Sequence, residues 1–130
     1  MDRLHAFAYF LEGMLPRATE PRCAAALAEG IDILAYHLRD LAPDVARSDV
    51  FAQLLRARIY ADAAGAVPLD RAASDWEAAQ LAAYQRADGG FWFGRKCEEW
   101  LPFVNPVSTA FASQALEMYT GRMAPVYLLI

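Results

Sequence analysis

The stretch Gln85-Arg86-Ala87-Asp88-Gly89-Gly90-Phe91-Trp92-Phe93-Gly94 separates a helical part of the chain from an aromatic part. Its Asp-Gly-Gly triplet predicts a turn, because glycine takes positive φ freely. Upstream of the turn, apolar residues recur at helical spacing. Downstream, residues 91–104 follow neither a 3.6-residue nor a 2.0-residue period, which predicts an ordered loop with room for a short hairpin.

Helices are expected on both sides of this stretch. The upstream helices cover 2–15, stopped by Pro16, then 21–41 after a Thr19 cap, 49–64 after a Ser48 cap, and 70–87 capped by Asp70. Gly30 inside the second helix predicts a close helix contact. Asn105-Pro106 predicts the start of a last helix over 105–120, which Gly121 ends.

These elements predict an all-α fold of antiparallel helical hairpins in one domain of 130 residues. The hairpins span 2–42 and 48–88, and the aromatic loop 89–104 leads to a half-hairpin over 105–121. The tail 122–130 is apolar, so its side chains must be shielded from water by another part of the domain or by a partner. It either packs back on the domain as a strand or binds a neighbouring chain.

Composition narrows the class of protein. The chain is 57% hydrophobic and 22% charged, which excludes a disordered chain, and its net charge of -4 disfavours nucleic acid as a partner. No uncharged apolar run approaches the roughly 18 to 20 residues that span a bilayer, and the N-terminus lacks a signal-peptide layout. We therefore expect a soluble, cytoplasmic protein without membrane contact.

Metal and cofactor signals are weak. Cys23 and Cys97 form neither a close pair nor a metal-binding spacing. His37, Asp40 and Asp44 offer one histidine with scattered aspartates, which is too little for a metal site. The sequence therefore predicts no metal and no cofactor.

Short internal similarities suggest a helical array. Phe7-Ala8, Phe51-Ala52 and Phe111-Ala112 align at intervals of 44 and 60 residues, and Ala35-Tyr36 aligns with Ala83-Tyr84 at an interval of 48. Repeats of about this length, each a helical hairpin, are typical of helical arrays.

With these repeats, the chain resembles the α/α-toroid proteins, which include terpenoid cyclases, protein prenyltransferases and six-hairpin glycosidases. Gln85, Gly89 and Phe91 match the cyclases' Gln-x-x-x-Gly-x-Trp element, with phenylalanine in place of tryptophan. The Asp88 to Phe91 turn also resembles the Asp-Gly-Gly-aromatic turns of sugar-active toroids. The resemblance implies a partial toroid or short solenoid, in which Gln85 and Gly89 join successive hairpins. It implies no catalytic set, because the cyclases' Asp-x-Asp-Asp motif and a zinc triad like that of the prenyltransferases are absent.

The first candidate site is a polar stripe. His5, Tyr9 and Glu12 share one helical face, and in the repeat alignment His5 matches Asp49 while Tyr9 matches Gln53. Such a stripe could line a central cavity, with the histidine and the glutamate as an acid/base pair. Alternatively, these are boundary residues with satisfied hydrogen bonds.

The second candidate site is acidic and aromatic, and comprises Asp88, Trp92, Arg95, Glu98, Glu99 and Trp100. Aromatic rings and carboxylates suit sugars or other small polar ligands, and a carboxylate pair could hydrolyse a glycosidic bond. Alternatively, the aromatics cover the ends of the hairpins and the acids are solvated.

Two functions follow from these observations. The first is a non-catalytic or auxiliary interaction domain, or the terminal part of a larger toroid. It would bind a partner or its own copy through the open edge of the array and the tail 123–130. The alternative is a fragment of a carbohydrate- or isoprenoid-active toroid enzyme, in which both candidate sites face one pocket.

Overall fold

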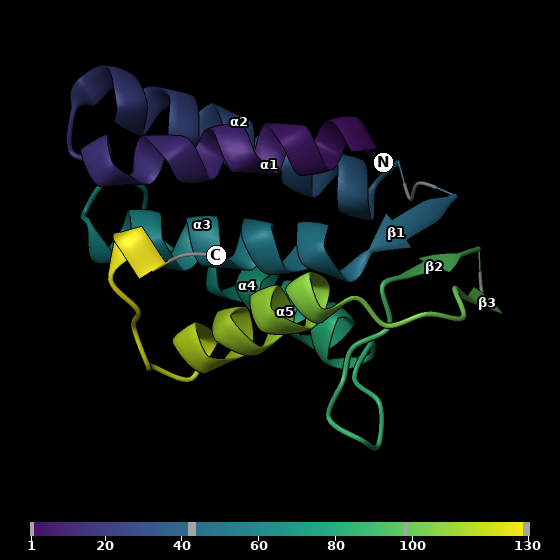
Figure 1. Cartoon of the computed structure of the whole chain (residues 1–130). Helices are drawn as coiled ribbons and strands as arrows, with labels where there is room; N and C mark the ends of the chain where they lie inside the picture. The colour runs from purple at the N-terminus through teal and green to yellow at the C-terminus, as the bar shows by residue number, and fades with distance from the viewer. Residues whose placement is uncertain (1, 42–43, 98, 129–130) are drawn as a thin grey trace.

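The computed structural model describes residues 2–41, 44–97 and 99–128, which fold into a mainly helical domain with a small sheet (Figure 1). The elements in chain order are α1 (Asp2–Met14), a 3₁₀ turn (Leu15–Arg17), α2 (Pro21–Arg39), β1 (Val45–Arg47), α3 (Ser48–Ala63), α4 (Arg71–Ala82), β2 (Gly94–Lys96), β3 (Glu99–Trp100), α5 (Pro106–Tyr119) and a second 3₁₀ turn (Val126–Leu128). The mainly helical class is therefore confirmed, and the sheet is an addition to the all-α prediction.

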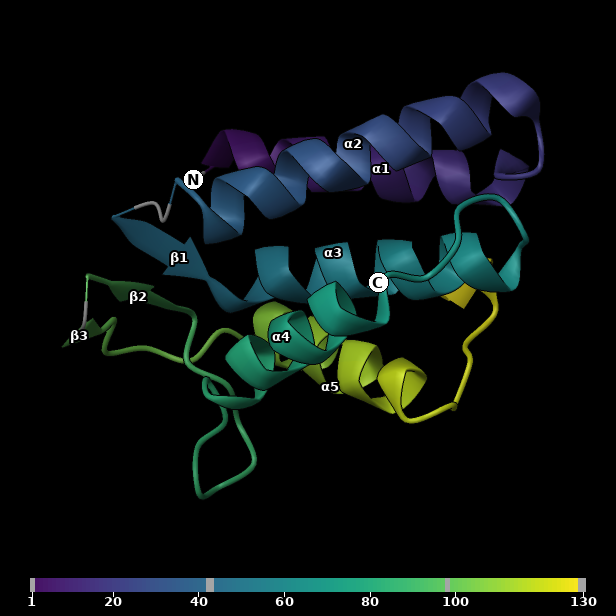
Figure 2. The same cartoon turned by 180° about the vertical axis from the view of Figure 1, so that it is seen from behind.

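The helices form two layers around α3. α1 and α2 lie on one side of α3, and α4 and α5 lie on the other, as the front and back views both show (Figures 1 and 2). α1, α3 and α5 run in the same direction, and α2 and α4 run in the opposite direction. Successive helices are thus antiparallel, as the hairpin pattern predicted.

α3 is the centre of the fold, because it contacts all four other helices. Every residue from Ser48 to Arg58 is buried. A helix buried all round is normally apolar, yet this segment includes Asp49, Gln53, Arg56 and Arg58. These polar residues need partners from the surrounding helices.

Several predicted helix ends differ from the observed ends, three of them at a predicted cap or by more than two residues. Glu20, not Thr19, is the N-cap residue of α2. Ser48 lies inside α3 and does not cap it, since its hydroxyl donates to the carbonyl of Phe93 at 3.1 Å. α4 ends at Ala82, five residues before the predicted Ala87, and the chain then turns toward the aromatic loop.

Other helix signals are confirmed. Asp70 caps α4 by accepting from the backbone N–H of Ala73 at 3.0 Å, and Asn105 caps α5 in the same way through Val107 at 2.8 Å. A Cβ atom on Gly30 would lie 2.3 Å from Cδ2 of Leu11, so this glycine permits the close approach of α1 and α2.

The aromatic loop contains a hairpin and joins a strand from elsewhere in the chain. β2 pairs antiparallel with β3, which confirms the hairpin, and on its other edge β2 pairs antiparallel with β1. β1 was not predicted, because three residues give too short a pattern to read. The three-stranded sheet ties the end of α2 and the start of α3 to the aromatic loop.

The tail packs back on the domain. Val126 contacts the hydrophobic core, and the carbonyl of Leu128 accepts a hydrogen bond from Nε2 of Gln114 at 2.9 Å. The tail therefore forms a 3₁₀ turn against the helices in its described part, and not the strand that was one of the two predicted arrangements.

One of the two predicted repeat alignments fits the pattern of burial. Ala8, Ala52 and Ala112 are all buried on α1, α3 and α5. The alignment of α2 with α4 does not fit, because the side chain of Tyr36 is 52% exposed and that of Tyr84 is 1% exposed. Tyr36 therefore lies on the exposed side of α2, whereas Tyr84 lies beyond the end of α4.

Candidate functional site

The predicted polar stripe comes together where α1 and α5 meet α3. Asp49, Gln53 and Arg56 follow one another by four and three residues on α3, so they share one face of that helix. His5 and Glu12 reach this face from α1. We refer to His5, Glu12, Asp49, Gln53 and Arg56 as the polar cluster.

Gln53 lies between the histidine and the glutamate. Its Nε2 donates to Glu12 Oε2 at 3.0 Å, and its Oε1 lies 2.8 Å from His5 Nδ1. Because an amide oxygen can only accept, His5 must carry a proton on Nδ1. His5 and Glu12 therefore do not contact each other as a direct acid/base pair. They are connected by hydrogen bonds to Gln53, which lies between them.

Arg56 anchors the cluster. Its side chain is fully buried, its Nε donates to Glu12 Oε1 at 3.0 Å, and its Nη2 forms an ion pair with the same oxygen. Nη1 donates to Gln114 Oε1 of α5 at 2.8 Å, and the guanidinium lies over the Phe111 ring at 4.2 Å. Arg56 thus joins three helices.

Burial opposes ionisation of both partners in this ion pair. Burial raises the pKa of Glu12, against the opposing effect of Arg56, and burial lowers the pKa of Arg56. Each side chain offsets part of the cost of burying the other. Glu12 is therefore committed to a structural ion pair.

Asp49 is also paired. Arg47 Nη2 donates to Asp49 Oδ2 at 2.6 Å, and the Ser108 hydroxyl donates to the same oxygen at 3.3 Å. His5 Nδ1 lies 3.9 Å away from Oδ2. The carboxylate therefore lies between its own helix, α5 and α1.

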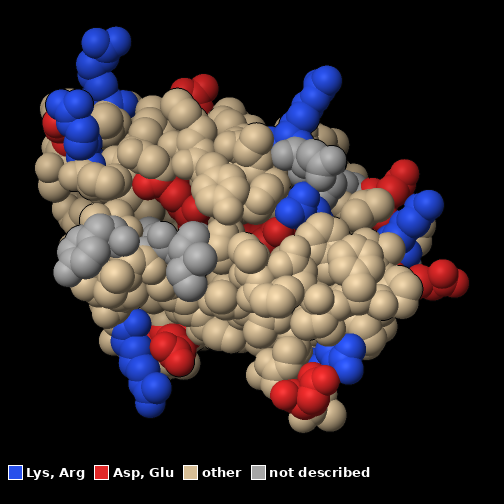
Figure 3. All heavy atoms as spheres, viewed as in Figure 1, with Lys and Arg blue, Asp and Glu red and all other residues tan. Residues whose placement is uncertain are grey.

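His5 and Tyr9 are the parts of the stripe that reach the surface. Their rings meet edge to face at 4.7 Å, Tyr9 is 45% exposed, and burial of its hydroxyl end raises the pKa of Tyr9. Figure 3 shows charged atoms recessed in the middle of this face, surrounded by uncharged atoms. Since Nδ1 is used by Gln53, the remaining nitrogen of His5, Nε2, has no partner among the described residues and can accept a hydrogen bond.

The second candidate site divides into separate contacts. Asp88 accepts from Arg86 Nη2 at 2.9 Å and from the backbone N–H of Gly90 at 3.1 Å, and these contacts lower the pKa of Asp88. Arg86 in turn lies over the Trp92 ring at 4.4 Å. Asp88 and Trp92 therefore meet through Arg86 at an exposed turn.

The remaining members lie on β2 and β3. Arg95 lies over the Trp100 ring at 5.8 Å, and Trp100 meets the buried ring of Tyr84 edge to face at 5.1 Å. Glu99 is exposed on β3. Glu98, also predicted, lies outside the described residues.

The first half of the stretch from Gln85 to Gly94 joins α4 to α5. The backbone N–H of Trp92 donates to the carbonyl of Tyr84 at 2.9 Å, and that of Phe91 donates to the Thr109 hydroxyl of α5 at 3.1 Å. Phe91 is buried. This geometry agrees with a structural role for the turn.

Arg47 links the polar cluster to the aromatic loop. Arg47 binds Asp49 of the polar cluster and lies over the Phe93 ring at 4.6 Å. Asp88 and Trp92 contact Arg86, and Trp100 contacts Arg95 and Tyr84. The structure therefore brings the polar cluster together and divides the second candidate site into two sets of contacts. The meeting of the two candidate sites in one pocket stays a prediction.

Sequence reasoning missed the arginines of α3. Arg56 is one; the other is Arg58, whose Nε donates to both carboxylate oxygens of Glu77 on α4, at 2.8 and 2.9 Å. Burial raises the pKa of Glu77 to about 7, against the opposing effect of Arg58. The spacing of Asp49, Gln53 and Arg56 was the signal that could have identified Arg56.

Three negative findings apply to the described part of the chain. No group of three or more histidines, cysteines and acids is placed to hold a metal ion. In the same residues, no helix has the length and apolar character to span a bilayer. A comparison of the sequence with family models, and of the chain with curated proteins and solved structures, found no match.

Proposed function

We propose that this chain is a non-catalytic helical interaction domain, the terminal part of a larger array of helical hairpins related to the α/α-toroids. The observation that supports the proposal best is the outer side of the α1/α2 hairpin. Phe10 is 59% exposed there and Ile33 is 41% exposed. Isolated exposed apolar residues are common, but these two line the same groove.

This groove has a volume of about 240 Å³ and lies between α1 and α2, lined by Phe7, Phe10, Ala26, Glu29, Gly30 and Ile33. Tyr36, one helical turn beyond Ile33, is exposed as well. We refer to these residues as the α1/α2 edge. It is acidic only at Glu29, which has no ion-pair partner among the described residues.

The occupant that fits this edge is a further helical hairpin. On the opposite side of the same hairpin, α3 packs against both α1 and α2. A helix docked on the α1/α2 edge would repeat that packing, with apolar side chains at helical spacing and a cation opposite Glu29. The polar cluster supports a non-catalytic role, because Glu12, Asp49 and Arg56 are already engaged in ion pairs within the domain.

A second copy of the chain offers such a hairpin, so light scattering over a range of concentrations tests the proposal. We expect the average mass to rise with concentration, and Phe10→Ser with Ile33→Ser to keep the chain monomeric. Val107→Ser is the matched control, because Val107 is 49% exposed on α5, away from this edge. A monomeric mass for the unaltered chain at the highest concentration, or equal association of all variants, would contradict the proposal.

A carbohydrate-binding or carbohydrate-active domain is the alternative function. It is favoured by the position of His5, whose Nε2 is left available beside the exposed ring of Tyr9. A hydroxyl group of a bound sugar could donate to Nε2 while the apolar face of the sugar ring stacks on Tyr9. Calorimetric titration with neutral mono- and disaccharides tests it, and His5→Ala is expected to abolish any binding. No measurable heat with any sugar would exclude this alternative.

A further inference from the structure

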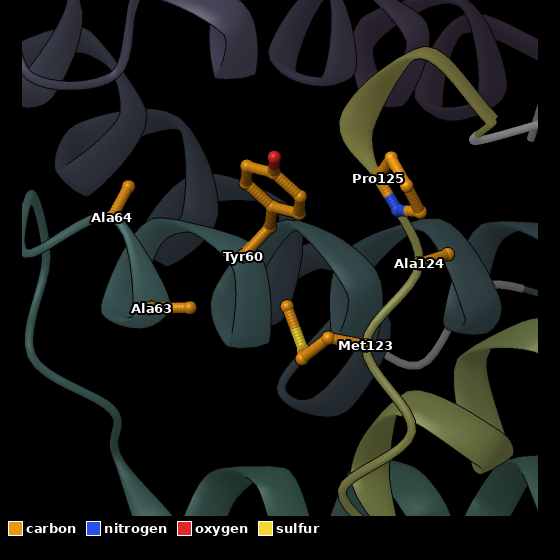
Figure 4. A pocket seen from close by; sticks show the side chains of 6 residues that line it. All are labelled: Tyr60, Ala63, Ala64, Met123, Ala124 and Pro125. Atoms are coloured by element: carbon orange, nitrogen blue, oxygen red, sulfur yellow. The ribbon is translucent and has the colours of Figure 1, made fainter.

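A second pocket lies at the other end of α3, where the tail crosses it. Tyr60, Ala63 and Ala64 of α3 form one wall, and Met123, Ala124 and Pro125 of the tail form the other (Figure 4). The pocket has a volume of about 380 Å³. This volume lies within the range of roughly 300 to 1,000 Å³ that small-molecule sites occupy.

The lining determines the kind of molecule that fits. None of the six lining residues carries a charge, so an ion would lose its hydration without compensation. The Tyr60 hydroxyl has no hydrogen-bond partner among the described residues, and in Figure 4 the Tyr60 ring rises between Ala64 and Pro125 while the Met123 side chain extends toward Ala63. The pocket thus offers apolar contacts and one hydrogen-bonding group.

The tail gives this pocket an adaptable wall. Met123 is 44% exposed, and an unbranched thioether adjusts readily to the shape of a ligand. Beyond it, Val126 contacts the core and Leu128 is held by Gln114. The wall is therefore anchored on its C-terminal side, and Met123 lines the pocket with a partly exposed side chain.

We propose that this pocket binds a small, uncharged and mainly apolar molecule carrying one hydroxyl or carbonyl group, which bonds to Tyr60. The site is independent of the α1/α2 edge, since the two pockets share no lining residue. Its test therefore succeeds or fails separately from that of the proposed interaction surface.

The probes are p-cresol and toluene, which differ by one hydroxyl group, titrated into the full chain while backbone amide resonances are recorded by NMR. We expect saturable shifts confined to residues 60–64 and 123–126. Since a hydrogen bond contributes roughly 0.5 to 1.5 kcal/mol, p-cresol should bind about 2- to 10-fold more tightly than toluene. Tyr60→Phe should remove this difference.

Ala63→Phe places a ring in the pocket and is expected to abolish binding of both probes. Ala25→Phe is the matched control, because both alanines are exposed helix residues and Ala25 lies on α2. Shifts that stay linear up to the solubility of the probes, or equal binding to the Ala63→Phe variant, overturn the proposal. Tyr60→Phe removes only one oxygen, so an unchanged preference for p-cresol in that variant also overturns it.

Discussion

Arg56 and Arg86 make the same types of contact in two different environments. Each pairs with a carboxylate and lies over an aromatic ring, Arg56 with Glu12 and Phe111 at 4.2 Å, and Arg86 with Asp88 and Trp92 at 4.4 Å. Arg56 is fully buried between three helices, whereas the side chain of Arg86 is 33% exposed at a turn. Burial, and not the type of contact, therefore decides what each arginine contributes.

The largest expected effect is the difference between Arg56→Ala and Arg86→Ala. Removing Arg56 leaves Glu12 buried without its partner, which should lower the free energy of unfolding by about 3 to 5 kcal/mol. Removing Arg86 breaks an exposed pair and should cost under about 1 kcal/mol. Urea denaturation of both variants measures the difference, and equal losses would refute the role assigned to burial.

The buried carboxyl group of Glu77 makes the stability of the folded chain depend on pH. Its pKa is about 7 in the folded chain and ordinarily 4.5, so between these values the folded chain holds a proton that the unfolded chain has lost. The stability that this proton contributes is complete below pH 4.5 and is lost as the pH rises to about 7.

We expect the free energy of unfolding to fall by about 1 to 3 kcal/mol across this window. Glu77→Gln should flatten that part of the profile, and Glu29→Gln, an exposed acid on α2, should not. Urea denaturation at pH 5 and pH 8 provides the measurement. A rise in stability over the same range would contradict the assignment.

Gly13 and Gly89 allow backbone conformation in the helix α1 to be compared with that in the turn before the aromatic loop. A Cβ atom on Gly13 of α1 or on Gly89 of the turn would meet nothing within 4 Å, but Gly89 has a φ of +86°. Gly89→Ala should therefore destabilise the chain by about 1 to 2 kcal/mol. Gly13→Ala should stabilise it by about 0.5 to 1 kcal/mol. Thermal melts of both variants check the signs, and a shift of the same sign would refute the comparison.

The smallest expected effect is the difference between the pKa values of the Glu12 and Asp88 carboxyl groups. Burial raises the pKa of Glu12, whereas the Gly90 N–H and Arg86 lower that of Asp88. Asp88 therefore adds stability above its ordinary pKa that disappears as the pH falls, and Glu12 behaves in the opposite sense. A carboxyl-carbon NMR titration should place Glu12 above and Asp88 below their ordinary values. Shifts in the same direction for both would contradict this interpretation.

Local signals predicted the helices well. The Asn105-Pro106 and Asp70 caps and the close contact at Gly30 follow from the conformational preferences of single residues, and the structure confirms them. The stripe of His5, Glu12, Asp49 and Gln53 was also predicted as a group, because helical spacing is regular enough to place side chains on a face.

The sequence could not predict contacts that depend on which helices are neighbours. β1 is recognisable only once β2 lies beside it, and Arg58 has a partner only because α4 places Glu77 against it. Tyr36 and Tyr84 share a dipeptide, yet only the packing determines that one is exposed and the other buried.

The common direction of α1, α3 and α5 has an electrostatic consequence. Each helix carries a partial positive charge of roughly half a unit at its N-terminal end, and all three ends point toward the sheet (Figure 1). Asp49, in the first turn of α3, supplies an acidic side chain there. The backbone field at this end of the molecule is therefore attractive to the buried carboxylate of Asp49.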